Sequence, residues 1–333
     1  MRRKILRALN GGLLAAACLI MGAAATQAQD KYPSKPIKVL VPYGPGSATD
    51  IAIRIVGEEM RHTLGQPVIV ENKPGAFGII AIEEMARAKP DGYTLQVGNS
   101  GTNSVAPLIY KKKFKINYDK DVVLVTRSSE LPLILVINPN LPVKTMAEFV
   151  AYAKANPNKV RYASVGIGSN NHYDTENFAR AAGIKLVHIP IKAGGAGIAQ
   201  AVLTDDANMT IVNAASSRGM VAAGKLLPLA VIGDKRLPEY PNVPSMAEVG
   251  FKGVGSGLWG ALYAPAKTPR PILEALRKGV ADALASEEVK TAFKKQMITP
   301  IPDPSLEAAA AWNKNETAYW RKITSEVKVE LPE

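Results

Sequence analysis

Cysteine and histidine are scarce: the 333 residues include one cysteine and three histidines. The cysteine, Cys18, lies in an N-terminal segment that we expect to be removed, so the mature chain has no residue for a disulfide or for thiol chemistry. The histidines, His62, His172 and His188, are not paired at the spacing of metal ligands. The sequence therefore predicts a protein without a metal site that folds on core burial alone.

Long hydrophobic runs are also missing beyond the N-terminal segment. Residues 1–28 contain a basic start, an apolar run over residues 13–25 and a small-residue cleavage site at Thr26-Gln27-Ala28. This pattern predicts a secretory signal peptide over residues 1–28 and a mature protein that begins near Gln29. An alternative is a lipoprotein anchored at Cys18, which follows three alanines. After residue 28, no run reaches the length of about 18 apolar residues that a membrane span needs.

Acidic residues are outnumbered by basic ones, and the formal net charge is +12. Loss of residues 1–28 would remove four basic and no acidic residues, and so would lower this charge by four. A basic balance can indicate nucleic-acid binding, but export argues against it and the charges are scattered. The one basic run, Lys111-Lys112-Lys113, is typical of a solvated face. We therefore expect no nucleic-acid partner.

Strands and helices alternate along the chain, which predicts a doubly wound α/β fold. The first half has apolar strands at residues 38–42, 68–72 and 94–98, and the second half has strands at residues 160–164, 186–190, 209–212 and 227–232. A strongly apolar strand is expected at residues 131–138. Residues 258–264 predict a strand that returns to the first half, and helices are expected at residues 271–285 and 305–327.

This pattern predicts two α/β domains with a cleft between them. We assign residues 29–132 and 258–333 to domain 1 and residues 133–257 to domain 2. Ligands of such sheets bind beyond the carboxyl ends of the strands. The loops that follow the strands in both domains are therefore the candidate binding loops.

The loop at residues 43–50 is the first of these candidates. Its glycines turn the chain from a strand into a helix, so free backbone N–H groups and the positive end of the helix dipole suit an anion such as a carboxylate or phosphate. Asp50 has two interpretations. It either complements the dipole of its helix, or it holds Ser47 or Thr49 or accepts a hydrogen bond from the ligand. A further polar loop is expected at residues 99–104.

A hydrolase is the alternative from another class of function. Ser169, His172 and Asp174 are residue types of a catalytic triad, but they lie too close in sequence to be held by separate elements. No Gly-x-Ser-x-Gly elbow surrounds Ser169. A loop that lines a binding site is the favoured interpretation. His172, inside this loop, is a candidate ligand contact, whereas His188 is typical of a core residue.

Two glycine-rich segments resemble cofactor motifs without completing them. Residues 192–197 lack the last position of a dinucleotide fingerprint, because Gln200 stands where glycine or alanine is needed. Residues 219–225 match the start of a phosphate-binding P-loop, but Leu226 stands where serine or threonine must hold magnesium. The sequence therefore predicts no cofactor.

Many short motifs, in order along the mature chain, resemble the Bug (TctC) family of solute receptors for tripartite tricarboxylate transporters. They include the Pro-Gly-x-x-Thr-Asp motif at residues 45–50 and the segments at residues 32–37, 65–75, 90–94, 162–164, 166–169, 223–226, 243–245, 248–250 and 264–269. Such a resemblance implies a periplasmic, type II binding protein of the Venus-flytrap kind, with two α/β domains joined by two crossing strands. It implies a receptor and not an enzyme.

The resemblance also implies a small carboxylate ligand, which closes the two lobes and is passed to membrane permease subunits. Carried over position by position, with His172 added from its glycine loop, the ligand-binding residues are Tyr43, Gly46, Ser47, Ala48, Thr49, Asp50, Asn99, Ser100, Thr102, Gly168, Ser169, Asn170, His172, Lys192, Ala193, Gly194 and Asn213. Tyr43 and Trp259 are candidates for an apolar wall. We expect a monomer that binds either an aliphatic or an aromatic acid.

This chain departs from the family pattern at two places. Ser47 and Ala48 replace glycines of the usual Gly-Gly-Gly-Thr-Asp, which restricts the backbone of the carboxylate loop, and Asn208 stands where aspartate is usual. A receptor that signals instead of delivering its ligand to a permease is a second alternative, because it would share the same ligand chemistry.

Overall fold

The computed structural model describes residues 32–191 and 194–330. The predicted signal peptide, residues 1–28, and the predicted contacts Lys192 and Ala193 lie outside the described residues. The fold below is that of the described residues from Lys35 onward. Within the described residues, no helix has the length and apolar character needed to cross a membrane.

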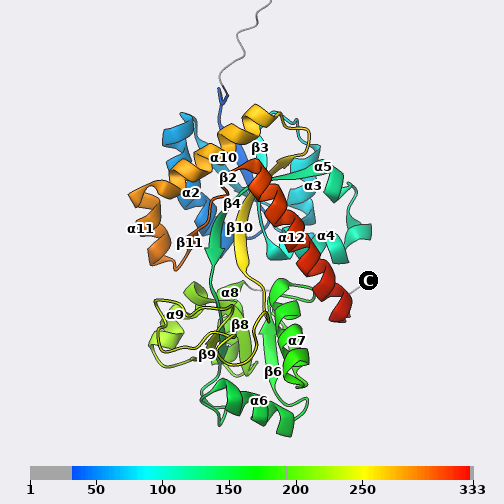
Figure 1. Cartoon of the computed structure of the whole chain (residues 1–333), viewed down its shortest axis with the longest axis vertical. Helices are drawn as coiled ribbons and strands as arrows, with labels where there is room; N and C mark the ends of the chain where they lie inside the picture. Colours follow the sequence, from blue (N-terminus) through cyan, green and yellow to red (C-terminus); the bar gives the residue numbers. More distant parts are fainter. Residues whose placement is uncertain (1–31, 192–193, 331–333) are drawn as a thin grey trace, which may run out of the picture. The chain divides into compact units, whose positions relative to one another are not determined.

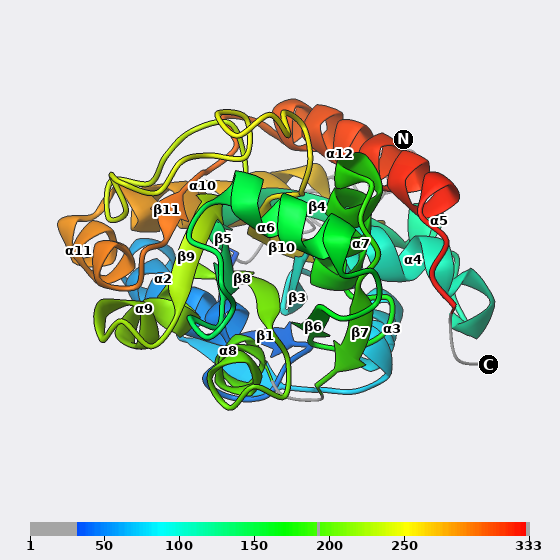
Figure 2. The same cartoon turned by 90° about the horizontal axis from the view of Figure 1, so that it is seen from below.

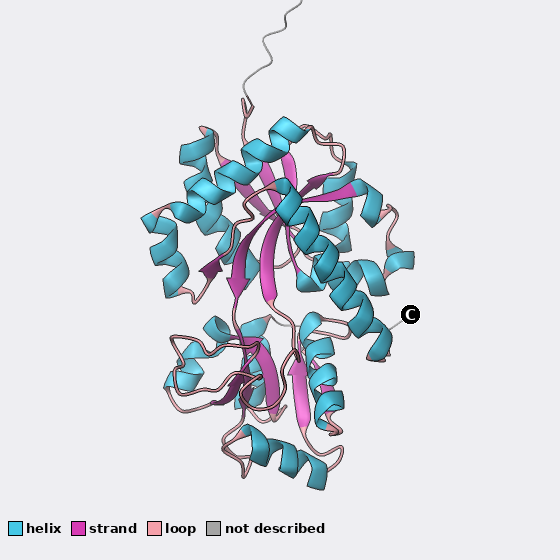
Figure 3. Ribbon diagram, viewed as in Figure 1, coloured by secondary structure: helices cyan, strands magenta, loops and turns pink. Residues whose placement is uncertain are grey.

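A six-stranded sheet forms the first lobe of this unit (Figures 1 and 3). Its order is β11-β4-β10-β3-β1-β2, and β1 pairs in parallel with both β2 and β3, while β10 is antiparallel to β3 and β4. The strands are β1 (Ile37–Val41), β2 (Val68–Asn72), β3 (Thr94–Asn99), β4 (Val122–Leu131), β10 (Leu258–Pro265) and β11 (Thr299–Pro300). The helices are α2 (Ala48–Leu64), α3 (Ile79–Arg87), α4 (Ala106–Ile109), α5 (Tyr118–Asp121), α10 (Arg270–Ala285), α11 (Glu287–Lys295) and α12 (Leu306–Glu326).

A five-stranded sheet forms the second lobe, in the order β7-β6-β8-β5-β9. Strand β6 is parallel to β7 and β8, and β5 is antiparallel to β8 and β9. The strands are β5 (Leu133–Ile137), β6 (Arg161–Ser164), β7 (Val187–Pro190), β8 (Met209–Asn213) and β9 (Leu227–Val231). The helices are α6 (Met146–Ala155), α7 (Asn170–Ala182), α8 (Gly195–Leu203) and α9 (Ala214–Ala222).

Helices cover the apolar sheet faces and close each core. In the second lobe, the fully buried rings of Phe149 in α6 and Phe178 in α7 stack with their centroids 6.4 Å apart. In the first lobe, Gly279 allows α10 to approach α2, because a β-carbon there would lie 3.1 Å from Cγ of Leu64. Figure 2 shows α7 beside α12, where Tyr173 meets Trp320 edge to face at 6.4 Å.

The predicted bounds of the apolar strand at residues 131–138 are wrong, because two strands meet within this segment. Strand β4 ends at Leu131 in the six-stranded sheet, and β5 begins at Leu133 in the other sheet. Pro132 separates them because it has no N–H to donate to a ladder, although its carbonyl accepts a hydrogen bond from Ala214 N. The return strand predicted at residues 258–264 is observed as β10.

The prediction of a polar loop at residues 99–104 is also wrong, because most of this segment is helical. Residues Ser100–Val105 form a turn of π-helix capped by Asn99. The Asn99 side chain accepts from Gly101 N and Thr102 N, while Thr102 Oγ1 accepts from Asn99 N. This reciprocal capping satisfies donors that a polar loop would leave to water.

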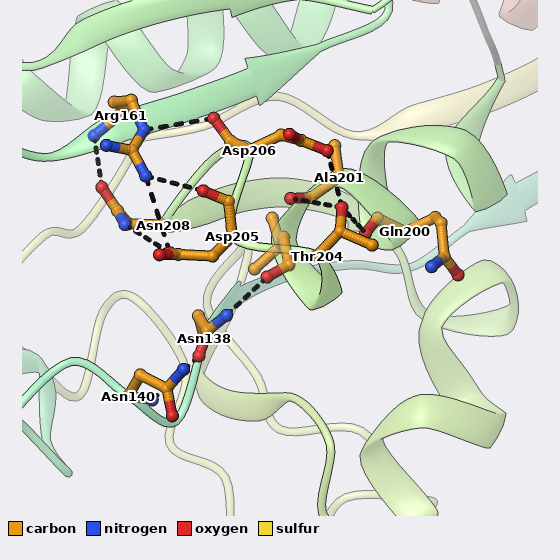
Figure 4. A network of polar contacts seen from close by, with 10 residues as sticks. Asn138, Asn140, Arg161, Gln200, Ala201, Thr204, Asp205, Asp206 and Asn208 are labelled. Carbon is orange, nitrogen blue, oxygen red and sulfur yellow. Dashed lines mark hydrogen bonds and ion pairs between the residues drawn. The ribbon is translucent and has the colours of Figure 1, made fainter.

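Asn208, one of the departures from the family pattern, has a structural role (Figure 4). Its side chain accepts from Arg161 N at 2.8 Å and donates to Asp205 Oδ1 at 2.9 Å. Arg161 also donates to the carbonyls of Asp205 and Asp206. The network joins the start of β6 to the turn between α8 and β8, and it therefore supports the second lobe at the amino ends of its strands, away from the carboxyl ends where the candidate loops lie.

Candidate functional site

A cavity of about 130 Å³ lies between the two lobes. Its wall comes from the ends of strands and the starts of the helices that follow them. The polar lining residues are Tyr43, Ser47, Thr49, Asn99, Asn170, Asn171 and Asn213; the others are Ala48, Leu133, Val165, Gly194, Gly195, Ile198, Ile211, Val212 and Leu258. No charged side chain lines it among the residues that the structure describes.

The first-lobe wall is the start of α2. Ser47 is the N-cap residue, and its Oγ accepts from Asp50 N at 3.3 Å. Ala48 and Thr49 follow as the first two helical residues, whose N–H groups have no partner within a helix. The predicted loop therefore presents backbone donors and the positive end of a helix dipole to the cavity.

Asp50 does not line the cavity and is 2% exposed. Its carboxylate accepts from Gly46 N at 2.9 Å, Arg54 Nε at 3.0 Å and Asn72 Nδ2 at 2.8 Å. Burial opposes ionisation, but the hydrogen bonds from Arg54, Gly46 and Asn72 together lower the pKa of Asp50. The charge is therefore compensated inside the first lobe, and Asp50 holds the loop.

Tyr43 and Asn99 form a hydrogen-bonded corner of the cavity. The Tyr43 hydroxyl donates to Asn99 Oδ1 at 2.7 Å, and Asn99 Nδ2 donates to Thr49 Oγ1 at 3.2 Å. Burial raises the pKa of Tyr43 to about 12, so the phenol stays neutral. Ser100 and Thr102 are buried within the π-helical turn and do not line the cavity.

The second-lobe wall is the start of α7. Asn170 and Asn171 are its first residues and line the cavity together with Val165. The Asn170 side chain forms no hydrogen bond with the described residues, so it is available to a ligand. Asn171 is held in place, because its Oδ1 accepts from Ser169 Oγ at 2.8 Å.

Gly168, Ser169 and His172 lie behind this wall. The Ser169 hydroxyl points to Gly166 O at 2.6 Å, and Gly168 N donates to His172 Nδ1 at 3.0 Å. The imidazole stacks on His188 with the ring centroids 3.8 Å apart. Burial, with a smaller contribution from His188, lowers the pKa of His172 to about 3, so the ring is neutral.

This geometry contradicts the hydrolase alternative. The Ser169 hydroxyl is bonded to a carbonyl and an amide oxygen, and His172 Nδ1 is occupied by the Gly168 N–H. Asp174 accepts from Ser256 N and Oγ, at 2.8 and 2.7 Å, and not from His172. The three residues form no relay from a carboxylate through imidazole to a nucleophile.

Two more helices begin at the cavity. Gly194 and Gly195 start α8, and Asn213 caps α9 by accepting from Ser216 N at 2.9 Å. A β-carbon on Gly195 would lie 2.8 Å from Asn213 Nδ2, so glycine is needed where these helix ends meet. Gly46 lines a neighbouring cavity of about 140 Å³, which shares Ala48 and Asn213 with the first.

Trp259 does not belong to the wall. Its Nε1 donates to Glu316 Oε1 at 2.8 Å, and its ring meets Trp312 edge to face at 4.9 Å. The preceding residue, Leu258, lines the cavity instead, because successive side chains of a strand point to opposite faces. The prediction of Trp259 as a wall residue was wrong by one position.

Asn171, Gly195 and the apolar lining residues were not predicted from the sequence. Asn171 follows Asn170 directly, so the start of α7 could have been extended by one residue. The side chains of Leu133, Ile198, Ile211 and Leu258 have no polar signal in the sequence and are brought together only by the fold. Within the described residues, no group of histidine, cysteine or acidic side chains could hold a metal ion.

Comparisons with known proteins identify the family. The model of the tripartite tricarboxylate transporter family receptor, TctC, matches residues 52–328. BugT of Bordetella pertussis (strain Tohama I) is 32% identical over 317 residues, which cover 93% of this chain and 94% of BugT.

Two solved structures are also similar. R. palustris Rpa4515 with adipate has a TM-score of 0.81 and 27% identity, covering 90% of this chain and 99% of that chain. MatC from Rhodopseudomonas palustris with bound malate has a TM-score of 0.78 and 29% identity, covering 88% and 99%. These matches confirm the predicted two-domain α/β fold and the predicted family. The chain therefore belongs to the TctC family of tripartite tricarboxylate transporter receptors, which are periplasmic solute-binding proteins and not enzymes.

Proposed function

We propose that the cavity captures a small organic carboxylate, aliphatic or aromatic, with one or two carboxyl groups. The observation that carries this proposal is that helices α2, α7, α8 and α9 all begin at a cavity that has no charged side chain among its described lining residues. Helix N-termini supply partial positive charge and N–H donors, which stabilise an anion without a counter-ion.

The apolar part of the wall favours an organic anion over phosphate or sulfate. Leu133, Val165, Ile198, Ile211 and Leu258 offer surface to a hydrocarbon segment. The volume of about 130 Å³ is well below the roughly 300–1,000 Å³ of sites for drug-sized molecules. The bound adipate and malate of the two Rhodopseudomonas relatives support the same chemical class.

The lobes should close on the ligand, because both of them contribute residues to the cavity wall. Ser47 and Asn99 belong to the first lobe, and Asn170 and Asn213 belong to the second, so a ligand that contacts all four holds the lobes together. We assign the moving bodies to residues 29–132 with 258–333 and to residues 133–257. Gly46, Gly168, Ser169 and Asp50 support the wall in this proposal, and Lys192 and Ala193 remain candidate contacts.

Export and delivery complete the proposed function. Residues 1–28 are removed as a signal peptide, so the intact mass of the exported protein should correspond to a start near Gln29. The ligand is then passed to the membrane permease subunits of a tripartite tricarboxylate transporter, as the family description suggests.

A thermal-shift screen with aliphatic and aromatic carboxylates tests the binding. A ligand at a hundred times its dissociation constant adds about 2.7 kcal/mol to the free energy of unfolding. Ala48→Phe should abolish this shift, because the ring would fill a cavity of about 130 Å³ from its wall. Ala310→Phe, on an exposed position of α12, is the matched control and should keep the shift.

Failure of every acid to shift the melting temperature of the wild-type protein would overturn the proposal. An equal shift for Ala48→Phe would move the site elsewhere. Delivery to a permease needs a separate test, namely uptake of the identified acid by a deletion strain. Unchanged uptake with normal binding would favour the signalling role over transport.

A further inference from the structure

The turn before α3 has an unusual backbone. Gly75, Ala76, Phe77 and Gly78 have consecutive positive φ angles of 134°, 44°, 55° and 86°. Glycine adopts such angles freely, but Ala76 and Phe77 carry a β-carbon that disfavours them. Strained non-glycine residues persist where the surrounding structure holds them, and they cluster at clamps and switches. Phe77 therefore needs an explanation beyond turn formation.

Core packing does not explain Phe77, which is 40% exposed. Its ring instead stacks on Tyr110, with the centroids 5.0 Å apart and the planes at 28°. Tyr110 is 4% exposed, and its hydroxyl donates to Ile167 O at 3.4 Å. Phe77 and Tyr110 belong to the first lobe, whereas Ile167 belongs to the second.

The Phe77 ring also reaches the second lobe directly. A β-carbon built on Gly166 would lie 3.8 Å from Cε1 and Cζ of Phe77. Gly166 and Ile167 lie between Val165, which lines the cavity, and α7, whose first residues Asn170 and Asn171 also line it. The two aromatic rings therefore contact the segment of the second lobe that carries this part of the ligand wall.

We propose that Phe77 and Tyr110 form an aromatic clamp, in which the left-handed turn holds the Phe77 ring against Gly166 and Ile167 when the lobes are closed. The clamp is a positioning device that slows ligand release and does not contact the ligand. This proposal rests on the proposed function only for the chemical class of the ligand, a small carboxylate. The contact between the lobes is seen in the structure itself.

Phe77→Gly tests the clamp, because glycine accepts the left-handed backbone and removes only the ring. We expect the dissociation rate of the bound carboxylate to rise about tenfold, since interface changes act mainly on dissociation. Tyr110→Phe keeps the stacked ring but removes the hydrogen bond to Ile167, so a smaller increase of about threefold is expected. Ile80→Ala is the matched control, because Ile80 is also apolar, 50% exposed and near the same turn.

Two readouts separate a clamp from a merely structural turn. Stopped-flow measurement with the acid identified by the thermal-shift screen gives the dissociation rate, and small-angle scattering of the ligand-free protein gives the radius of gyration. A clamp predicts faster release and a larger radius for Phe77→Gly, and wild-type values for Ile80→Ala. Release within twofold of wild type, together with an unchanged radius, would overturn it. If the wild-type protein bound no acid, the proposed function would fail, and the radius alone would decide on the clamp.

Discussion

The loops that begin α2 and α7 present similar groups to the cavity but are supported by different chemistry. In the first lobe, the buried carboxylate of Asp50 collects donors from Gly46, Arg54 and Asn72. In the second lobe, neutral groups support the wall, because the Ser169 hydroxyl points to Gly166 O and the stacked imidazoles of His172 and His188 are uncharged.

This difference shows that each lobe keeps uncompensated charge away from the cavity wall. Behind the first wall, the Asp50 carboxylate is paired with Gly46, Arg54 and Asn72, so its negative charge would not oppose the proposed anionic ligand. A charged imidazole behind the second wall would be attractive for an anion but costly to bury, and the structure keeps it neutral. The two supports should therefore respond differently to mutation and to pH.

The largest effect should come from Asp50→Ala. The change removes the acceptor of Gly46 N–H and of Arg54 Nε, and leaves Asn72 Nδ2 with the Tyr43 carbonyl alone, so we expect a loss of about 2–3 kcal/mol in the free energy of unfolding. Urea denaturation measures this loss. Carboxylate binding should weaken as well, because the loop that carries Ser47 and Ala48 is no longer held.

Asp119→Ala provides the control, since Asp119 is an exposed acid in the first turn of α5. It should change stability by less than about 0.5 kcal/mol. Equal effects at the two positions would show that Asp50 acts only as a first-turn acid, and the contrast between the two loops would then be lost.

The second effect concerns pH. The pKa of His172 is about 3 in the folded protein and 6.5 in its unperturbed form, so the unfolded chain takes up the proton first as the pH falls. Stability is therefore complete above about pH 6.5 and declines towards pH 3. At pH 5 the loss from this residue is about 2 kcal/mol.

His172→Gln should flatten the fall in stability between pH 7 and pH 5, measured by urea denaturation at each pH. His62→Gln, on the exposed end of α2, should leave that fall unchanged. Asp50 does not affect this pH range: because its pKa is lowered, its contribution to stability is fully present above the ordinary aspartate value of 3.8 and is lost only as the pH falls below it. An unaltered slope for His172→Gln would argue against a neutral support in the second lobe.

The smallest effect is expected for Ser169→Ala. A neutral hydroxyl with carbonyl and amide partners contributes about 1 kcal/mol, so the free energy of unfolding should fall by that amount. Carboxylate affinity should remain within about threefold, because Asn170 and Asn171 form the wall and Ser169 lies behind it. Isothermal titration decides between this role and direct contact, which would lower affinity by tenfold or more.

Local patterns predicted much of the fold and part of the candidate site. Apolar runs followed by polar turns, rich in glycine after β1 and β6 and in serine after β8, indicated the strand-to-helix junctions. The residues at these junctions include Ser47, Asn170 and Asn213, which line the cavity. Such junctions are local in sequence, because a strand end, a cap residue and a helix start adjoin each other along the chain.

Only the tertiary structure decided which groups face the cavity. Asp50 could serve the ligand or the loop, and the position of Asn72, 22 residues away, determined that it serves the loop. Contacts with Gly168 and His188 hold the His172 side chain behind the cavity wall. Successive side chains of β10 point to opposite faces of the sheet, so Leu258 lies in the wall and Trp259 does not. The sequence by itself determined the order of elements and the residues at which the helices beside the cavity begin, since these depend on neighbours in the chain. Side-chain direction and charge compensation depend on contacts between distant segments, and these exist only once both lobes have folded.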